Sequence, residues 1–114
     1  MRLLVCGGRD FNNQSRVFHV LYKIHEKRPI TEIIHGDARG ADSLAGRWAQ
    51  IEHIKETAVP ADWDTHGKAA GLLRNQQMLE MKPDGVVAFP GGRGTAHMVR
   101  IAKQEGITVM EIPK

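Results

Sequence analysis

Short apolar runs alternate with amphipathic helical stretches along all 114 residues, and this alternation limits the possible folds more than any other feature. Runs of about four to six apolar residues are typical of strands buried on both faces of a sheet. The predicted strands lie at residues 3–6, 32–35, 54–59, 85–89 and 108–112. The stretches between them carry apolar residues at helical spacing. The predicted helices lie at 15–27, around 41–49, at 68–81, and across 95–102 with an end at Gly106.

Five strands that alternate with four helices over short connections indicate an α/β fold. We expect one three-layer domain over residues 1–114, built on an open, mostly parallel five-stranded sheet with helices on both faces. The chain contains no internal repeat and no linker. Its length suits one compact domain of ordinary size.

Glycine is enriched at 12 of 114 residues, and its distribution carries the functional signal. Seven glycines fall in the predicted strand-to-helix loops, at positions 7, 8, 36, 40, 91, 92 and 94. In a parallel α/β sheet these loops share the edge formed by the carboxyl ends of the strands, where ligands bind. The sequence therefore predicts a ligand site at this edge.

The loop Pro90-Gly91-Gly92-Arg93-Gly94-Thr95 follows a predicted buried strand and precedes a helix. Glycines allow the backbone to approach a ligand closely, and the free amides of a helix N-terminus attract an anion. Thr95 adds a hydroxyl and Arg93 a charge, so the loop is predicted to bind phosphate. The alternative is a tight turn in which Thr95 caps the helix.

Two further loops place charged residues at the same edge. In Cys6-Gly7-Gly8-Arg9-Asp10, Arg9 can hold a phosphate and Asp10 can accept a bond from a ribose hydroxyl. The loop Gly36-Asp37-Ala38-Arg39-Gly40-Ala41-Asp42 is similar, and we include Gly36, Asp37, Arg39, Gly40 and Asp42 in the predicted site. The alternatives are glycine turns with exposed charges, and an ordinary helix cap at Asp37 or Asp42.

Two other features allow more than one interpretation. Arg74-Asn75 are polar residues in the middle of a predicted helix, where either a ligand or a solvated helix face explains them. Trp63, between two aspartates, could stack on a base or simply pack its loop onto the domain.

Metal and thiol chemistry are not expected. His19 and His25 do not share a helix face, and His35, His66 and His97 have no acidic or cysteine partners at metal-ligand spacing. Cys6 ends an apolar strand and is predicted to be a small buried side chain rather than a nucleophile. We expect no cofactor.

Charge and hydropathy exclude further classes of protein. Sixteen Lys and Arg against 13 Asp and Glu give a net charge of +3, without a run of like charges. This does not suggest a dedicated duplex-DNA binder, so nucleic acid is not an expected partner. The single cysteine fits a reducing compartment, and no apolar run approaches the ~20 residues of a membrane span. We expect a cytoplasmic protein without a membrane partner.

Five segments together resemble the YspA-like family of the SLOG superfamily. They are residues 5–11 (VCGGRDF), 35–45 (HGDARGADSLA), 60–71 (PADWDTHGKAAG), 74–78 (RNQQM) and 90–95 (PGGRGT). The superfamily includes the "lonely guy" phosphoribohydrolases and the DNA-processing protein DprA. The resemblance covers nearly the whole chain and implies a Rossmann-like fold and a nucleotide-derived ligand.

One residue departs from the phosphoribohydrolase pattern. Those enzymes share a Pro-Gly-Gly-x-Gly-Thr-x-x-Glu segment and an upstream arginine, which Arg74 resembles, but Met98 stands in place of the glutamate. Hydrolysis of an N-glycosidic bond needs a carboxylate near the oxocarbenium-like transition state, and a thioether cannot replace it. Met98 also lies on the apolar stripe of its helix. If hydrolysis occurs, the carboxylate must come from Asp10, Asp37, Asp42 or Asp62.

We therefore expect a binding module that holds a nucleotide or nucleotide-derived ligand, as a sensor, carrier or sequestering protein. The first alternative is a nucleoside 5′-monophosphate phosphoribohydrolase, with Arg74 and Asp42 as candidate catalytic residues. The second is single-stranded DNA binding, implied only by DprA and the positive charge. Because the phosphoribohydrolases complete their sites across a dimer interface, the resemblance also implies a homodimer or higher homo-oligomer.

Overall fold

The computed structural model describes residues 1–114 and contains one sheet of five parallel strands. The strands are β1 (Arg2–Cys6), β2 (Glu32–His35), β3 (Lys55–Ala58), β4 (Gly85–Ala88) and β5 (Thr108–Glu111). Their order across the sheet is β3-β2-β1-β4-β5, and all neighbours are parallel. The predicted α/β class is confirmed, and the sheet is wholly rather than mostly parallel.

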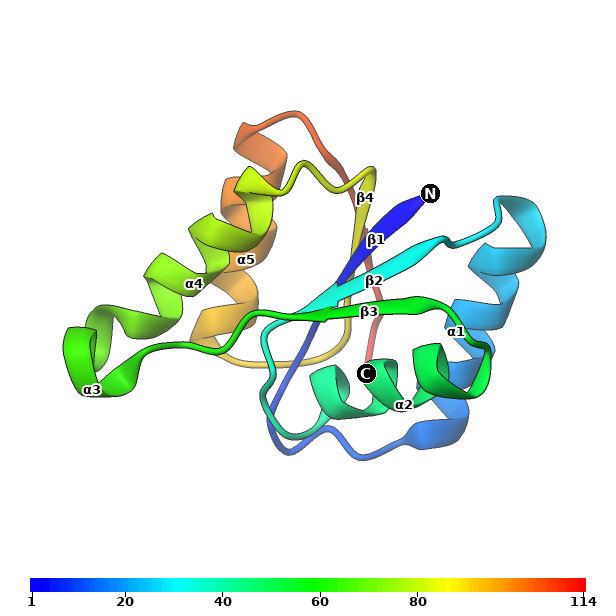
Figure 1. Ribbon diagram of the computed structural model, residues 1–114, viewed down its shortest axis with the longest axis horizontal. Coiled ribbons are helices and arrows are strands. Elements are labelled where there is room, and N and C mark those ends of the chain that lie inside the picture. Colours follow the sequence, from blue (N-terminus) through cyan, green and yellow to red (C-terminus); the bar gives the residue numbers. More distant parts are fainter.

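Helices cover both faces of the sheet and complete three layers (Figure 1). Helices α1 (Gln14–Lys27) and α2 (Ala41–Ile51) cover one face, and α4 (Ala70–Glu80) and α5 (Arg93–Gln104) cover the other. A short helix α3 (Trp63–His66) and a 3₁₀ turn η1 (Gly67–Ala69) connect β3 to α4. No helix is both long and apolar enough to cross a membrane. The architecture is that of a Rossmann-like domain.

Strand β1 shows why a continuous apolar run forms the centre of this fold. Successive side chains of a strand point to opposite faces. Leu3 and Val5 pack into the core under α1 and α2, whereas Leu4 and Cys6 pack into the core under α4 and α5. The central strand is therefore buried on both faces, as its sequence predicts.

Met98 belongs to the core beneath α4 and α5, where its exposed fraction is 0%. The prediction that it lies on the apolar stripe of its helix is confirmed. At the position of the missing glutamate, the chain has a fully buried thioether.

The strand order places a crevice between the carboxyl ends of β1 and β4. The chain leaves β1 toward α1 on one face and leaves β4 toward α5 on the other (Figure 1). Adjacent strands whose connections diverge in this way form the usual ligand crevice of an open α/β sheet. Residues that follow β1 and β4 therefore line a common site.

Three local predictions differ from the structure. The loop after β3 contains helix α3, because the Asp62 carboxylate accepts a hydrogen bond from the Thr65 amide at 3.2 Å and caps it. The helix predicted at 68–81 begins with the 3₁₀ turn and becomes α-helical at Ala70. Helix α5 begins at Arg93 with Gly92 as its N-cap, so Thr95 is not the cap, and Gly94 lies in the first helical turn rather than in the loop.

Candidate functional site

Backbone hydrogen bonds join the three glycine loops at Gly8. The Gly8 amide donates to the Pro90 carbonyl at 2.9 Å, and the Gly8 carbonyl accepts from the Ala41 amide at 3.2 Å. Loops that lie far apart in the sequence therefore meet within hydrogen-bond distance at the edge of the sheet, as predicted for carboxyl-end loops.

This close approach accounts for several of the glycines. A Cβ on Gly7 would lie 2.6 Å from the Ala41 Cβ, and one on Gly8 would lie 2.9 Å from the Pro90 carbonyl oxygen. Gly40 has φ +80°, and its Cβ would meet the backbone of Gly8 and Arg9. By contrast, a Cβ on Gly92 or Gly94 would meet nothing within 4 Å. Several of the glycines thus allow the loops to pack closely together, whereas Gly92 and Gly94 at the start of α5 leave open space.

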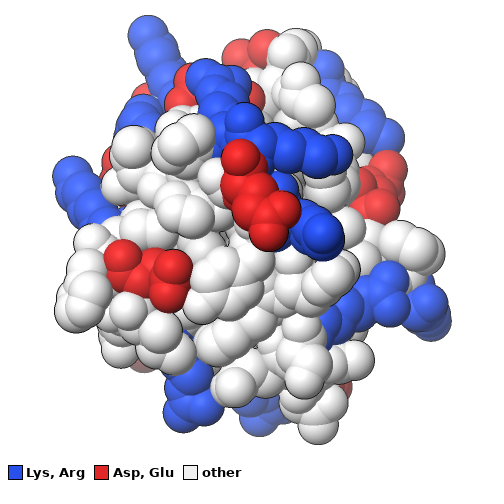
Figure 2. Space-filling view, turned by 90° about the vertical axis from the view of Figure 1, so that its right-hand side faces the viewer, with Lys and Arg blue, Asp and Glu red and all other residues white.

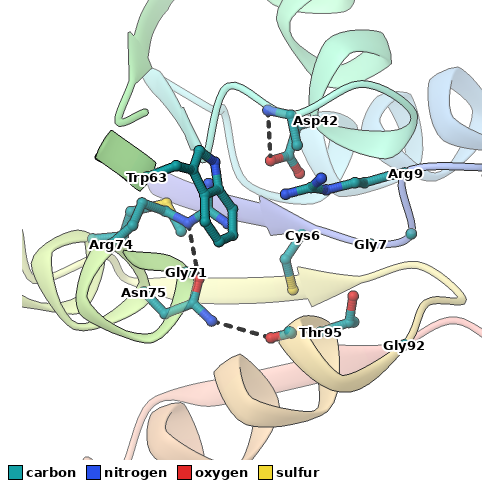
Figure 3. A pocket seen from close by; sticks show the side chains of 14 residues that line it. Cys6, Gly7, Arg9, Asp42, Trp63, Gly71, Arg74, Asn75, Gly92 and Thr95 are labelled. Carbon is teal, nitrogen blue, oxygen red and sulfur yellow. Dashed lines mark hydrogen bonds between the residues drawn. The ribbon is translucent and has the colours of Figure 1, made fainter. Parts of the chain in front are cut away.

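A cavity of about 290 Å³ lies between these loops, helix α4 and the first turn of α5 (Figure 3). We call it the glycine-loop cavity. Fourteen residues line it. Nine of them belong to the predicted site: Gly7, Gly8, Arg9, Asp42, Arg74, Asn75, Gly92, Gly94 and Thr95.

A second cavity of about 460 Å³ lies beside the first, and we call it the arginine cavity. It contains the predicted residues Gly36, Asp37 and Arg39, together with Pro60 and Ala61. Four residues line both cavities and form a shared wall: Arg9, Ala38, Trp63 and Arg74. The predicted site residues therefore divide between two adjacent hollows.

Five predicted residues line neither cavity: Asp10, Gly40, Pro90, Gly91 and Arg93. Asp10 pairs instead with Arg39 at 3.3 Å, on an exposed surface. Gly40, Pro90 and Gly91 contribute to the contacts between the loops. The geometry assigns these three a structural role.

Arg74 and Asn75 are not a solvated helix face. Asn75 is only 4% exposed, and the half-buried Arg74 guanidinium donates from Nη1 to the Gly36 carbonyl. Arg74 Nε also donates to Asn75 Oδ1 at 3.2 Å (Figure 3). Asn75 Nδ2 in turn donates to the Gly94 carbonyl and to His97 Nδ1, both at 3.1 Å. This pair connects α4 to the β2 loop and to the first turn of α5.

Asp42 is 6% exposed and organises the loop that precedes it. Its Oδ2 accepts hydrogen bonds from the amides of Gly36 at 3.0 Å and Ala38 at 3.4 Å. Burial raises the pKa of this carboxyl, although these bonds and the charge of Arg74 oppose the change. Neither Asp37 nor Asp42 caps α2, because Gly40 is its N-cap.

The buried His35 fixes the same loop from the other side. Its Nδ1 accepts from the Asp37 amide at 3.0 Å, so its Nε2 carries the proton that it shares with Glu56 Oε2 at 2.6 Å. Through these hydrogen bonds His35 and Asp42 together position the loop. No group of three or more His, Cys, Asp or Glu side chains could hold a metal ion.

Trp63 and Cys6 also line the glycine-loop cavity. The 48% exposed Trp63 ring lies beneath the Arg9 guanidinium, whose central carbon is 5.3 Å from the ring centroid. Burial raises the pKa of the Cys6 thiol to about 12, so it is not a nucleophile at neutral pH. Ala38, Gly71 and Met78 also line the cavity. Their place in the lining could not be predicted from the sequence, because none of the three carries a polar or charged group.

His97 should make the stability of the protein depend on pH. Burial, followed by the charge of Arg100, lowers its pKa from the ordinary 6.5, so folding favours the neutral ring that accepts from Asn75. The contribution of His97 to the free energy of unfolding is complete above about pH 6.5, and it is lost as the pH falls through the lowered pKa. Urea unfolding between pH 5 and 8 should show a steeper loss below pH 6.5 for the wild type than for His97→Gln. Equal slopes would contradict the assignment.

Residues 1–66 match the sequence model of the family described as the YspA, cpYpsA-related SLOG family. The chain belongs to this SLOG family. It is also similar to the Gene 61 protein of Mycobacterium phage D29, with 38% identity over 96% of this chain and 94% of the phage protein. No solved structure matches the chain.

SLOG membership confirms the resemblance that the glycine-loop motifs suggest. It supports binding of a nucleotide-related ligand in general, whereas the name of the phage protein specifies no activity. The match over residues 1–66 includes the β1 and β2 loops and Trp63. Arg74, Asn75 and the first turn of α5 lie beyond the matched residues, so their roles rest on the geometry.

Proposed function

We propose that this SLOG protein binds a nucleotide or nucleotide-derived ligand in the glycine-loop cavity, with a phosphate group at the first turn of α5. The observation that carries the proposal is the convergence of uncapped helix amides with Thr95, Arg9 and Arg74 around one cavity. Gly92 makes no side-chain cap, and no side chain covers the space beside it. Amides at a helix N-terminus favour an anion through their N–H groups and the helix dipole.

The charges around the cavity also favour an anionic ligand. Arg9 stacks on Trp63 without a hydrogen-bond partner for its guanidinium, so all its N–H groups are free to donate. Arg74 retains further N–H groups beyond its two bonds. The one carboxylate in the lining, Asp42, already accepts two backbone bonds. Two cationic side chains therefore line the cavity, together with one carboxylate that is already hydrogen-bonded to the backbone.

Trp63 offers a surface for the base of such a ligand. Its ring is about half exposed and lines the same cavity as the phosphate-binding groups. Stacking of a base on an aromatic ring tolerates any base and contributes about 1–3 kcal/mol. A phosphate group at α5 and a base at Trp63 would place the ribose across the cavity. The protein would then act as a sensor, carrier or sequestering module.

A thermal-shift panel tests the proposal. Nucleoside mono- and diphosphates, ADP-ribose forms and cyclic nucleotides are compared with the free nucleosides, which lack phosphate. A ligand at 100 times its Kd stabilises the native state by about 2.7 kcal/mol, which raises the Tm by several degrees. We expect a shift with at least one phosphorylated compound and a smaller one with its nucleoside. The proposal fails if no compound shifts the Tm.

Phosphoribohydrolysis is the second candidate, and Asp42 is the observation that favours it. A buried carboxyl with a raised pKa can serve as a general acid, and Asp42 is the one carboxylate in the lining. If the protein only binds its ligand, it should release no free base from nucleoside 5′-monophosphates, and the ligand should still stabilise the Asp42→Asn variant. Chromatography of monophosphates incubated with the protein decides between binding and hydrolysis. Sustained base release that Asp42→Asn reduces at least 100-fold would establish the hydrolase instead.

No observation favours single-stranded DNA binding. On the face drawn in Figure 2, Lys and Arg lie interspersed with Asp and Glu rather than in one basic stripe. A nucleic-acid groove usually combines such a stripe with several aromatic side chains.

A further inference from the structure

The arginine cavity has no role in the proposed phosphate site, although the two share a wall. A volume of about 290 Å³ puts the glycine-loop cavity alone at the lower limit of small-molecule sites, which span roughly 300–1,000 Å³. The arginine cavity, of about 460 Å³, begins on the other side of Trp63 and Arg9. A nucleotide that fills the first cavity and stacks on Trp63 therefore extends toward the second.

The arginine cavity is built for a negative group. Arg9, Arg39 and Arg74 line it, against a single carboxylate on Asp37. Arg39 is the one arginine that belongs to this cavity alone. Its partner is Asp10 at 3.3 Å, and the two side chains are 76% and 95% exposed. An ion pair this exposed is weak, so a ligand phosphate can displace Asp10 at little cost.

The order of groups across the two cavities defines a ligand class. The first turn of α5 lines one cavity, Trp63 lies in the wall that both cavities share, and Arg39 lines the other cavity. We propose that the preferred ligand carries phosphate groups at both the 5′ and the 3′ position of its ribose, as a nucleoside 3′,5′-bisphosphate does, and that Arg39 binds the second phosphate. This inference rests on the proposed function, because it takes the first phosphate to lie at α5.

Calorimetric titration with three adenosine compounds tests the inference. The probes are adenosine 5′-monophosphate, adenosine 5′-diphosphate and adenosine 3′,5′-bisphosphate. The 5′-diphosphate carries its second phosphate at the same end of the molecule, so it controls for added charge. We expect the 3′,5′-bisphosphate to bind about tenfold more tightly than either other compound, as one additional charge-assisted contact provides. Because Arg39 is exposed, this preference should decrease as salt is raised.

Substitution of Arg39 separates the second phosphate from the first. Arg39→Gln should remove the preference for the 3′,5′-bisphosphate and leave the affinity for the 5′-monophosphate unchanged. Arg28→Gln is the matched control, since Arg28 is an exposed arginine at the opposite edge of the sheet, and it should preserve the preference. Both variants should keep the wild-type Tm.

The outcomes distinguish this inference from the proposed function. If the monophosphate binds but the 3′,5′-bisphosphate shows no advantage, or if Arg39→Gln preserves that advantage, the inference is wrong and the phosphate site at α5 stands. If none of the three compounds binds and the wider panel is also silent, the proposed function fails together with the inference.

Discussion

Replacing Gly92 with aspartate should abolish binding of phosphate-bearing ligands without weakening the fold. Gly92 is the N-cap of α5, has a negative φ of −100°, and has space for a Cβ. Aspartate is a preferred N-cap residue, so the Tm of the unliganded protein should be unchanged or higher. The new carboxylate would lie beside the amides that are proposed to bind phosphate. Like charges at a binding site cost several kcal/mol, so we expect affinity to fall on the order of 100-fold or more.

Gly92→Asn provides the matched control for this variant. Asparagine has nearly the same size as aspartate and also caps helices, but it carries no charge. Calorimetric titration should show a much smaller loss of affinity for Asn than for Asp. If the two variants bind equally well, or if Gly92→Asp binds like the wild type, phosphate does not lie at the start of α5.

Replacing Gly40 with alanine should cause the largest loss of stability among the loop glycines. Gly40 has φ +80°, a conformation that costs other L-residues about 1–2 kcal/mol. Its Cβ would also meet backbone atoms of Gly8 and Arg9, with the Arg9 carbonyl oxygen 2.6 Å away. Backbone atoms cannot move aside as a flexible side chain can, and such overpacking costs about 1–3 kcal/mol. Urea unfolding should therefore show a loss of about 3 kcal/mol.

Gly106→Ala separates the two causes of that loss. Gly106 has φ +75°, but a Cβ there would meet nothing within 4 Å. This variant should lose about 1 kcal/mol, from the backbone conformation alone. Gly40→Ala should also weaken ligand binding, because it displaces Gly8 and Arg9, whereas Gly106→Ala should not. Equal losses of stability would show that the loops separate easily and that Gly40 is not confined.

The fold follows from patterns that are local in the chain. The run at β1 alternates its side chains between two cores, and the amphipathic stripe of α1 specifies which face of that helix is buried. These patterns predict the five strands and four longer helices because burial of apolar side chains dominates the free energy of folding. The start of α5 was mispredicted because a glycine-rich segment signals a loop, although Gly94 is accommodated in the first helical turn.

That the loops after the strands meet at one edge could be predicted, because the carboxyl ends of parallel strands lie together. That rule brings Gly7, Arg9, Asp42 and Thr95 to one cavity without any knowledge of their contacts. The rule cannot show that the Asp10 side chain points outward and pairs with Arg39. The sequence gives no means of telling a charged loop residue that faces outward from one that lines a cavity. Nor can helical periodicity show whether a polar residue in mid-helix faces solvent or, like Asn75, a buried partner.

The sequence by itself determined the α/β class, the SLOG resemblance, the edge where a ligand would bind, and the methionine in place of a glutamate. Only the tertiary structure decided which glycines join the loops and which leave space, that Asn75 and Arg74 connect α4 to its neighbours, and that Trp63 divides two cavities. The reason is physical. Secondary structure depends on residues a few positions apart, whereas a cavity depends on side chains from Cys6 to Thr95 that only the packed sheet brings together.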